Sequence, residues 1–170
     1  MGMMQGPVMK FTVARAVLAS VVDILIGGAS VGEFTYGLVS FNQEPSSPVD
    51  VPLMIDADEV RNVLTAWRGN PGGMTSVGDG LCSAESVLRA YGCIDDPVDD
   101  FIIIATDGME NTPAFVAEVL PQIKNTTTIF AIGIGDVGDQ WTALLRTIAA
   151  GGSGKGKYYV SDNFNAMEAI

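Results

Sequence analysis

The chain has 170 residues, 48% of them hydrophobic, so it can bury one sizeable core, and no Pro/Ser-rich stretch is long enough to separate two domains. Twenty acidic against nine basic residues give a formal net charge of −11, which argues against nucleic acid and anionic membrane surfaces as partners and favours cations. Histidine is absent, which excludes Ser-His and Cys-His nucleophile pairs and most zinc sites and leaves a narrow catalytic repertoire.

The predicted elements alternate along the chain. Apolar residues at helical spacing predict helices over residues 7–26, from 56, over 81–91, from about 113, over 139–150 and from 162, and runs of branched and aromatic residues predict strands over 34–41, 49–55, 101–106, 126–134 and 157–160. Strands that alternate with helices of this length specify an α/β fold, with a three-layer, mostly parallel sheet and helices on both faces. Pro48 and Pro52 make 49–55 an edge strand, antiparallel to 34–41 in a hairpin.

The apolar run from Phe11 to Ile26 has some features of a targeting segment. It is short, however, contains Arg15 and Asp23, and has no small-residue cleavage pattern behind a basic start. We therefore expect no targeting signal and no membrane insertion.

The stretch 101–108 organises the rest of the chain. Its first four residues are large and apolar without polar alternation, which predicts a central strand that is covered on both faces. Thr106, Asp107 and Gly108 follow at the carboxyl end of this strand, where open α/β sheets bind their ligands. Asp107 is therefore a candidate ligand of a metal or substrate, with the cap of a turn as the alternative.

Three motifs occur in a fixed order: Gly-Gly-Met-Thr-Ser-Val-Gly-Asp-Gly-Leu at 72–81, Phe-Ile-Ile-Ile-Ala-Thr-Asp-Gly at 101–108 and Ile-Phe-Ala-Ile-Gly-Ile-Gly at 129–135. With the preceding hairpin, they resemble a von Willebrand factor type A domain from about Met4 to the end of the chain. The resemblance implies a Rossmann-like sheet and a metal-ion-dependent adhesion site, where a divalent cation binds a protein partner whose acidic side chain completes the coordination.

The resemblance also assigns metal ligands to this chain. Thr75 and Asp107 match the threonine and aspartate of the second and third loops of the adhesion site, and Ser76 and Asp79 are further candidate oxygens. A hydroxyl and a carboxylate with open positions suit Mg²⁺, with Mn²⁺ or Ca²⁺ as alternatives.

The beginning of the chain departs from the family pattern. The first loop of the family reads Asp-x-Ser-x-Ser, but Met1 and Met3 fall on the two serines, and thioether sulfur is a poor ligand for a hard cation. The strand before this loop is also missing, so we expect a single domain over residues 1–170 that is truncated at the amino terminus and at the carboxyl terminus. Metal should bind weakly. The sheet should either keep a gap of roughly 10 Å between 34–41 and 101–106, filled by a strand from another chain, or close up.

Two alternatives to the binding module stay open. Gly133–Gly138 follows a strand and opens a helix, as in a dinucleotide-binding enzyme, but Asp136 and Asp139 would repel a pyrophosphate. The other alternative is a structural domain whose metal site is vestigial. We expect a binding module and no enzyme.

Overall fold

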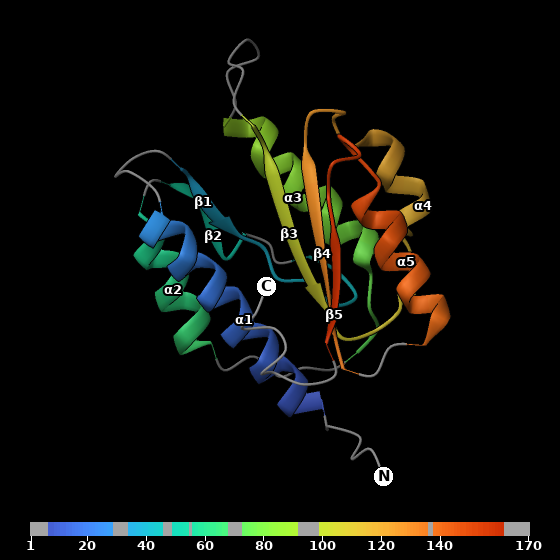
Figure 1. The fold of residues 1–170 in the computed structure, drawn as a ribbon, viewed down its shortest axis with the longest axis horizontal. Coiled ribbons are helices and arrows are strands. Elements are labelled where there is room, and N and C mark those ends of the chain that lie inside the picture. Colours follow the sequence, from blue (N-terminus) through green and yellow to red (C-terminus); the bar gives the residue numbers. More distant parts are fainter. Residues whose placement is uncertain are drawn as a thin grey trace.

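The computed structural model describes residues 7–28, 34–45, 49–54, 56–67, 73–91, 99–135 and 138–161. The described elements appear in Figure 1: helices α1 (Pro7–Gly28), α2 (Ala57–Ala66), α3 (Val77–Tyr91), α4 (Val116–Val119) and α5 (Asp139–Ala149), the 3₁₀ turn η1 (Leu120–Gln122), and strands β1 (Tyr36–Leu38), β2 (Val51–Met54), β3 (Phe101–Thr106), β4 (Thr128–Ile134) and β5 (Tyr158–Ser161). The helix expected from residue 162 lies outside the described residues.

Strands β3, β4 and β5 form a parallel sheet with β4 in the middle. The register pairs Phe101 with Thr128 and Thr106 with Gly133, so β3 and β4 end at the same edge of the sheet. Six of the seven residues of β4 are buried, as expected for a strand that is covered on both faces. The predicted α/β class with a mostly parallel sheet is confirmed.

Alternate residues of β3 enter two different cores. Ile102 and Ile104 pack with α3, α4 and α5, whereas Ile103 and Ala105 pack with Val17 of α1. Successive side chains of a strand point to opposite faces, so this division places α1 on one face of the sheet and α3, α4 and α5 on the other. Figure 1 shows these three layers.

Strands β1 and β2 form a separate antiparallel pair. They pack with α2 and with the carboxyl-terminal part of α1, and the core of this part contains Val22, Val51, Val60 and Leu64. The described residues thus form two separate sheets, which agrees with the first of the two expected arrangements, in which the sheet does not close between 34–41 and 101–106. Strand β1 also spans three residues where the sequence predicts a strand over 34–41. A strand that pairs on one side alone has fewer ladder bonds to extend it.

Helix α1 joins the two parts of the molecule. The Arg15 side chain donates to the carbonyl oxygens of Leu64 and Thr65, at 2.6 and 2.7 Å, and to that of Trp67. These carbonyls lie in and just after the last turn of α2, where a helix leaves acceptors without partners and favours a positive charge. Arg15 thus holds the end of α2 against α1.

One described stretch, Lys10–Gly28 of α1, is long and apolar enough to cross a membrane by length and composition, with a mean hydropathy of 1.7. Eleven per cent of the window is buried. The core helix of a soluble protein and a signal sequence near the amino terminus can share these properties, and α1 packs on α2, β3 and β4. The absence of membrane insertion stays a prediction.

Candidate metal centre

The predicted ligands lie on loops at the carboxyl ends of the strands. Thr106 ends β3 and is buried, and its hydroxyl group donates to the Gly108 carbonyl oxygen at 3.1 Å and accepts from the Gly108 N–H at 3.4 Å. This tight turn leaves the Asp107 side chain exposed. The hydroxyl of Thr106 is therefore used for the turn, and the carboxylate of Asp107 is presented to solvent.

The structure brings Thr75 and the Asp107 loop together. A Cβ atom added to Gly108 would lie 3.9 Å from Thr75 Oγ1. Asn111 joins the two loops, because its side-chain oxygen accepts from the Thr75 N–H at 2.8 Å and its own N–H donates to the Thr75 carbonyl oxygen at 3.0 Å. No sequence pattern predicts this role of Asn111, since nothing in the sequence ties it to a residue 36 positions earlier.

Ser76 and Asp79 hold the start of α3. Ser76 is fully buried, and its Oγ lies 2.9 Å from Asp79 Oδ2 and 3.1 Å from the Ala114 carbonyl oxygen. Asp79 Oδ2 accepts from the Ala114 N–H at 3.2 Å, and the Asp79 N–H donates to Ser76 Oγ at 3.3 Å. This is the arrangement of a helix cap. Both side chains would have to leave these bonds to bind a cation, so their role as ligands stays a prediction.

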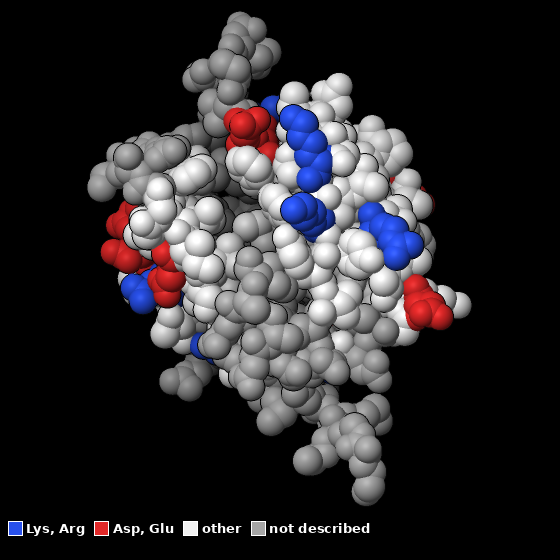
Figure 2. Space-filling model, in the orientation of Figure 1, with Lys and Arg blue, Asp and Glu red and all other residues white. Residues whose placement is uncertain are grey.

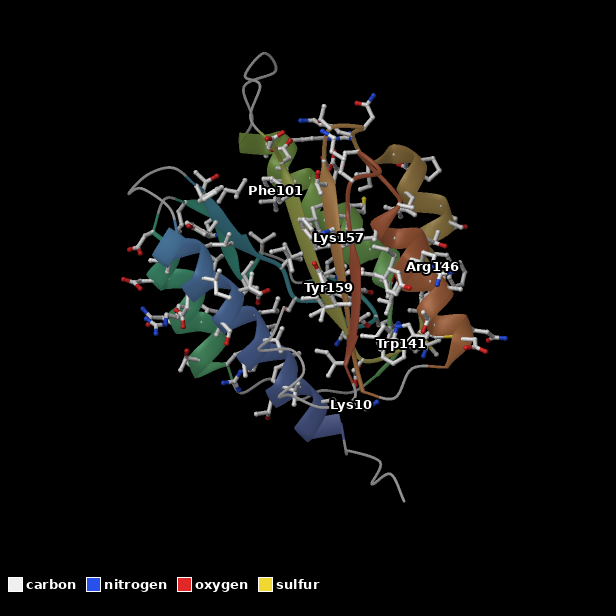
Figure 3. The ribbon with its side chains drawn as sticks, in the orientation of Figure 1. Lys10, Phe101, Trp141, Arg146, Lys157 and Tyr159 are labelled. Carbon is white, nitrogen blue, oxygen red and sulfur yellow. The ribbon has the colours of Figure 1, made fainter. Side chains whose placement is uncertain are left out.

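Lys10 reaches the same edge of the sheet from the amino-terminal turns of α1. Its ammonium group donates to the Asp107 carbonyl oxygen at 3.4 Å, and Figure 3 shows it beside the ends of the strands. Gly135 makes room for it, since an added Cβ would lie 3.2 Å from Lys10 Cε, and the φ of 102° at Gly135 also favours glycine. The one signal in the sequence is a single basic residue early in an apolar helix, which does not by itself predict a contact with the Asp107 loop.

The donor atoms at this edge are of the type that binds a divalent cation, but they are few. Thr75 and Asp107 supply hard oxygen atoms of the kind that Mg²⁺ and Ca²⁺ prefer. Within the described ranges, no group of three or more His, Cys, Asp or Glu residues is placed to hold a metal. The ammonium group of Lys10 adds a positive charge next to the site. The arrangement therefore suits a weak, open site.

Comparison with known proteins assigns the family. Residues 7–170 match the family model of the von Willebrand factor type A domain. The chain belongs to this family. The predicted family and the predicted fold class are thus confirmed. A comparison with curated protein sequences found no match for this von Willebrand factor type A domain.

Solved structures also support the assignment of the fold. Proximal thread matrix protein 1 from the mussel byssus, with a zinc-occupied MIDAS motif, is 20% identical with a TM-score of 0.73, covering 94% of this chain and 40% of that protein. A von Willebrand factor type A protein from Catenulispora acidiphila is 19% identical with a TM-score of 0.72, covering 94% and 36%. The conserved hypothetical protein BatB from Bacteroides thetaiotaomicron is 20% identical with a TM-score of 0.66, covering 94% and 84%. This chain spans less than half the length of the first two proteins.

Some sequence-based predictions fall outside the described residues. The first-loop positions 1–6 do so, as do residues 136 and 137 of the glycine loop and Asp162. Gly138, at the far end of that loop, is the N-cap residue of α5. The dinucleotide-binding alternative therefore stays a prediction, and no described contact favours it.

Proposed function

We propose that this von Willebrand factor type A domain is a protein-binding module and not a catalyst. It recognises an acidic side chain of its partner at the carboxyl end of β3, through a divalent cation held by Thr75 and Asp107. The observation that carries the proposal is the junction at Asn111, which ties the two loops so that a hydroxyl and an exposed carboxylate lie at one edge of the sheet. The fold shared with a protein whose MIDAS motif holds zinc supports a metal at this edge.

The three residues have different roles at the site. Thr75 and Asp107 supply the oxygen atoms, and Asn111 sets the distance between their loops. A bound cation would cancel the repulsion between Asp107 and an acidic partner, which this acidic chain would otherwise repel. With two side chains as ligands, affinity should be low, with a dissociation constant above about 10⁻⁴ M.

Titration with Mg²⁺ followed by amide NMR tests the metal site. The amide signals of Thr75, Gly108 and Asn111 should shift, and adding acetate, the smallest carboxylate, should shift them further. Asp107→Ala should remove both effects. Asp99→Ala is the matched control, because Asp99 is an exposed aspartate at the opposite end of β3, and it should change neither. Unaltered shifts in Asp107→Ala would show that the proposed site is wrong.

A further inference from the structure

Three basic side chains gather at the amino end of β5, on the opposite edge of the sheet from Thr75 and Asp107. Arg146 lies in the last turn of α5, and Lys155 and Lys157 lie on the turn that leads into β5. All three are exposed. Figure 2 shows basic side chains over α5 and β5 with no acidic side chain between them, and Figure 3 labels Arg146 and Lys157 there. These three residues are called the basic patch below.

The basic patch has no acidic partner within the described part of the chain. The ion pairs among the described residues engage Arg61, Arg89 and Lys124, and none of the patch residues. The whole chain has 20 acidic residues for nine basic ones, so three exposed cations without a carboxylate differ from the rest of its surface. Like charges that lie together repel each other, and a bound anion relieves this repulsion. The patch therefore suits a negatively charged ligand.

The patch borders a pocket of about 360 Å³ between the end of α5 and the start of β5. Arg146 and Lys157 line this pocket, Tyr158 and Tyr159 add aromatic surface, and none of its described lining residues is acidic. The other lining residues are small, namely Ala149, Ala150, Gly154 and Gly156. Because small side chains leave the space between the two cations open, a ligand can lie between them.

Tyr158 holds the Arg146 side chain in place. Arg146 Cζ lies 5.4 Å from the centre of the Tyr158 ring, and Arg146 Nη2 donates to the Tyr158 hydroxyl oxygen at 3.1 Å. A guanidinium group has five N–H donors in a planar fork, so this bond leaves other donors for a carboxylate. A side chain that is already held also loses less conformational entropy on binding than a free one.

The surroundings of the patch favour a short acidic segment of a protein over a long polyanion. Asp99 and Asp100 precede β3 at the same edge of the sheet, and Asp139 begins α5. Nucleic acid or an anionic membrane on the patch would extend over these carboxylates and over a chain with a net charge of −11. A segment of a few residues can stay on the patch, and salt screens more distant charges beyond roughly 10 Å.

We propose that the basic patch is a second docking surface, which binds a short acidic segment of a protein partner. Clustered carboxylates of this segment pair with Arg146, Lys155 and Lys157, and Arg146 supplies the fixed, planar donor of the three. The proposal does not depend on a metal at Thr75 and Asp107, because the two surfaces lie on opposite edges of the sheet.

A synthetic peptide, Gly-Glu-Asp-Glu-Glu-Gly, is the probe, added to the full chain without divalent cations and followed by amide NMR. The signals of Gly154, Gly156 and Tyr158 should shift, and those of Thr75 and Asn111 should not. Added salt should weaken the binding, because the charges that pair are exposed. The control peptide, Gly-Gln-Asn-Gln-Gln-Gly, has nearly the same shape without the charges and should cause no shift.

Variants of the chain locate the surface. Lys157→Glu should weaken peptide binding on the order of tenfold, since an attraction becomes a repulsion. Arg61→Glu is the matched control, because it changes the net charge by the same amount at a half-exposed site on α2, and it should change binding by less than about twofold. Arg146→Gln should also weaken binding. The comparison of the two peptides uses the unaltered chain, so it stays decisive if a variant fails to fold.

Four results would overturn the proposal. Failure of the acidic peptide to shift any signal at low salt would show that the patch binds no such segment. Equal losses in Lys157→Glu and Arg61→Glu would show a response to net charge alone. Shifts centred on Thr75 and Asn111 would place the peptide at the candidate metal centre. Tighter binding of a single-stranded oligonucleotide or of phosphatidylserine vesicles would assign the patch to a polyanion.

Discussion

Replacing Glu85 by alanine should destabilise the fold far more than replacing its ionic partner does. Glu85 is 4% exposed, and its carboxylate accepts from Arg89 Nε at 3.0 Å, from the Lys124 N–H at 3.1 Å and from Thr127 Oγ1 at 3.1 Å. These bonds tie α3 to the loop before β4. In Glu85→Ala, the Lys124 N–H and the fully buried Thr127 hydroxyl lose their acceptor, at about 1–3 kcal/mol each, so the total should reach about 2–6 kcal/mol.

Arg89→Ala removes the exposed partner of the same ion pair. The Arg89 side chain is 51% exposed, so this variant should lose about 1 kcal/mol or less. Urea unfolding followed by circular dichroism measures both variants, with unchanged slopes as the condition for comparing them. A double-mutant cycle with Thr127→Val should show coupling with Glu85. Equal losses for Glu85→Ala and Arg89→Ala would refute the reasoning, because the buried acceptor would then have no special weight.

Three further predictions concern single residues. Gly156→Ala should cost about 3 kcal/mol or more, because the added Cβ would lie 1.9 Å from the Ile129 carbonyl oxygen, so the backbone must move. Arg15→Ala should cost about 1–2 kcal/mol in urea unfolding, because the end of α2 loses its cationic donor. The pKa of Glu110 is raised above its usual 4.5, because the effect of burial exceeds the opposing effect of the hydrogen bond from the Val116 N–H. The free energy of unfolding should therefore fall as the pH rises from 4.5 through the higher pKa of the folded state. The melting temperature should follow this fall in the unaltered chain and change less with pH in Glu110→Gln.

Each of these predictions has a matched control. Gly138→Ala should cost below about 1 kcal/mol, since nothing lies within 4 Å of its added Cβ. Arg61→Ala removes a half-exposed pair with Asp23 and should also cost below about 1 kcal/mol. Glu59→Gln, at an exposed glutamate, is the same substitution away from Glu110 and gives the baseline against which Glu110→Gln is compared. A control that loses as much as its test variant would contradict the corresponding argument.

The parts of the fold that depend on local pattern were predictable. An unbroken apolar run specified β3 at 101–106, because a strand that is covered on both faces needs no polar residue. The helix expected from about residue 113 instead begins at Val116, whose N–H donates to Glu110 Oε2 at 2.7 Å. A cap from six residues earlier is a tertiary arrangement that helix-start patterns do not contain.

The candidate site was also predictable only in part. The meeting of the Thr75 and Asp107 loops follows from two chain segments that end at one edge of a sheet. Lys10 lies 97 residues before Asp107, and no spacing rule connects them. Ser76 and Asp79 show the opposite difficulty. Their spacing fits both a helix cap and a pair of ligands, and only the position of Ala114 shows which bonds they make.

The place of α1 on the sheet has a consequence for synthesis of the chain. Val17 of α1 packs against Ile132 and Ile134 of β4, which the ribosome adds more than a hundred residues later. At bacterial or eukaryotic elongation rates this interval lasts on the order of 5–20 s. Throughout it, a helix with a mean hydropathy of 1.7 has no sheet to cover. The nascent chain should therefore be a client of chaperones that hold apolar segments until β4 emerges.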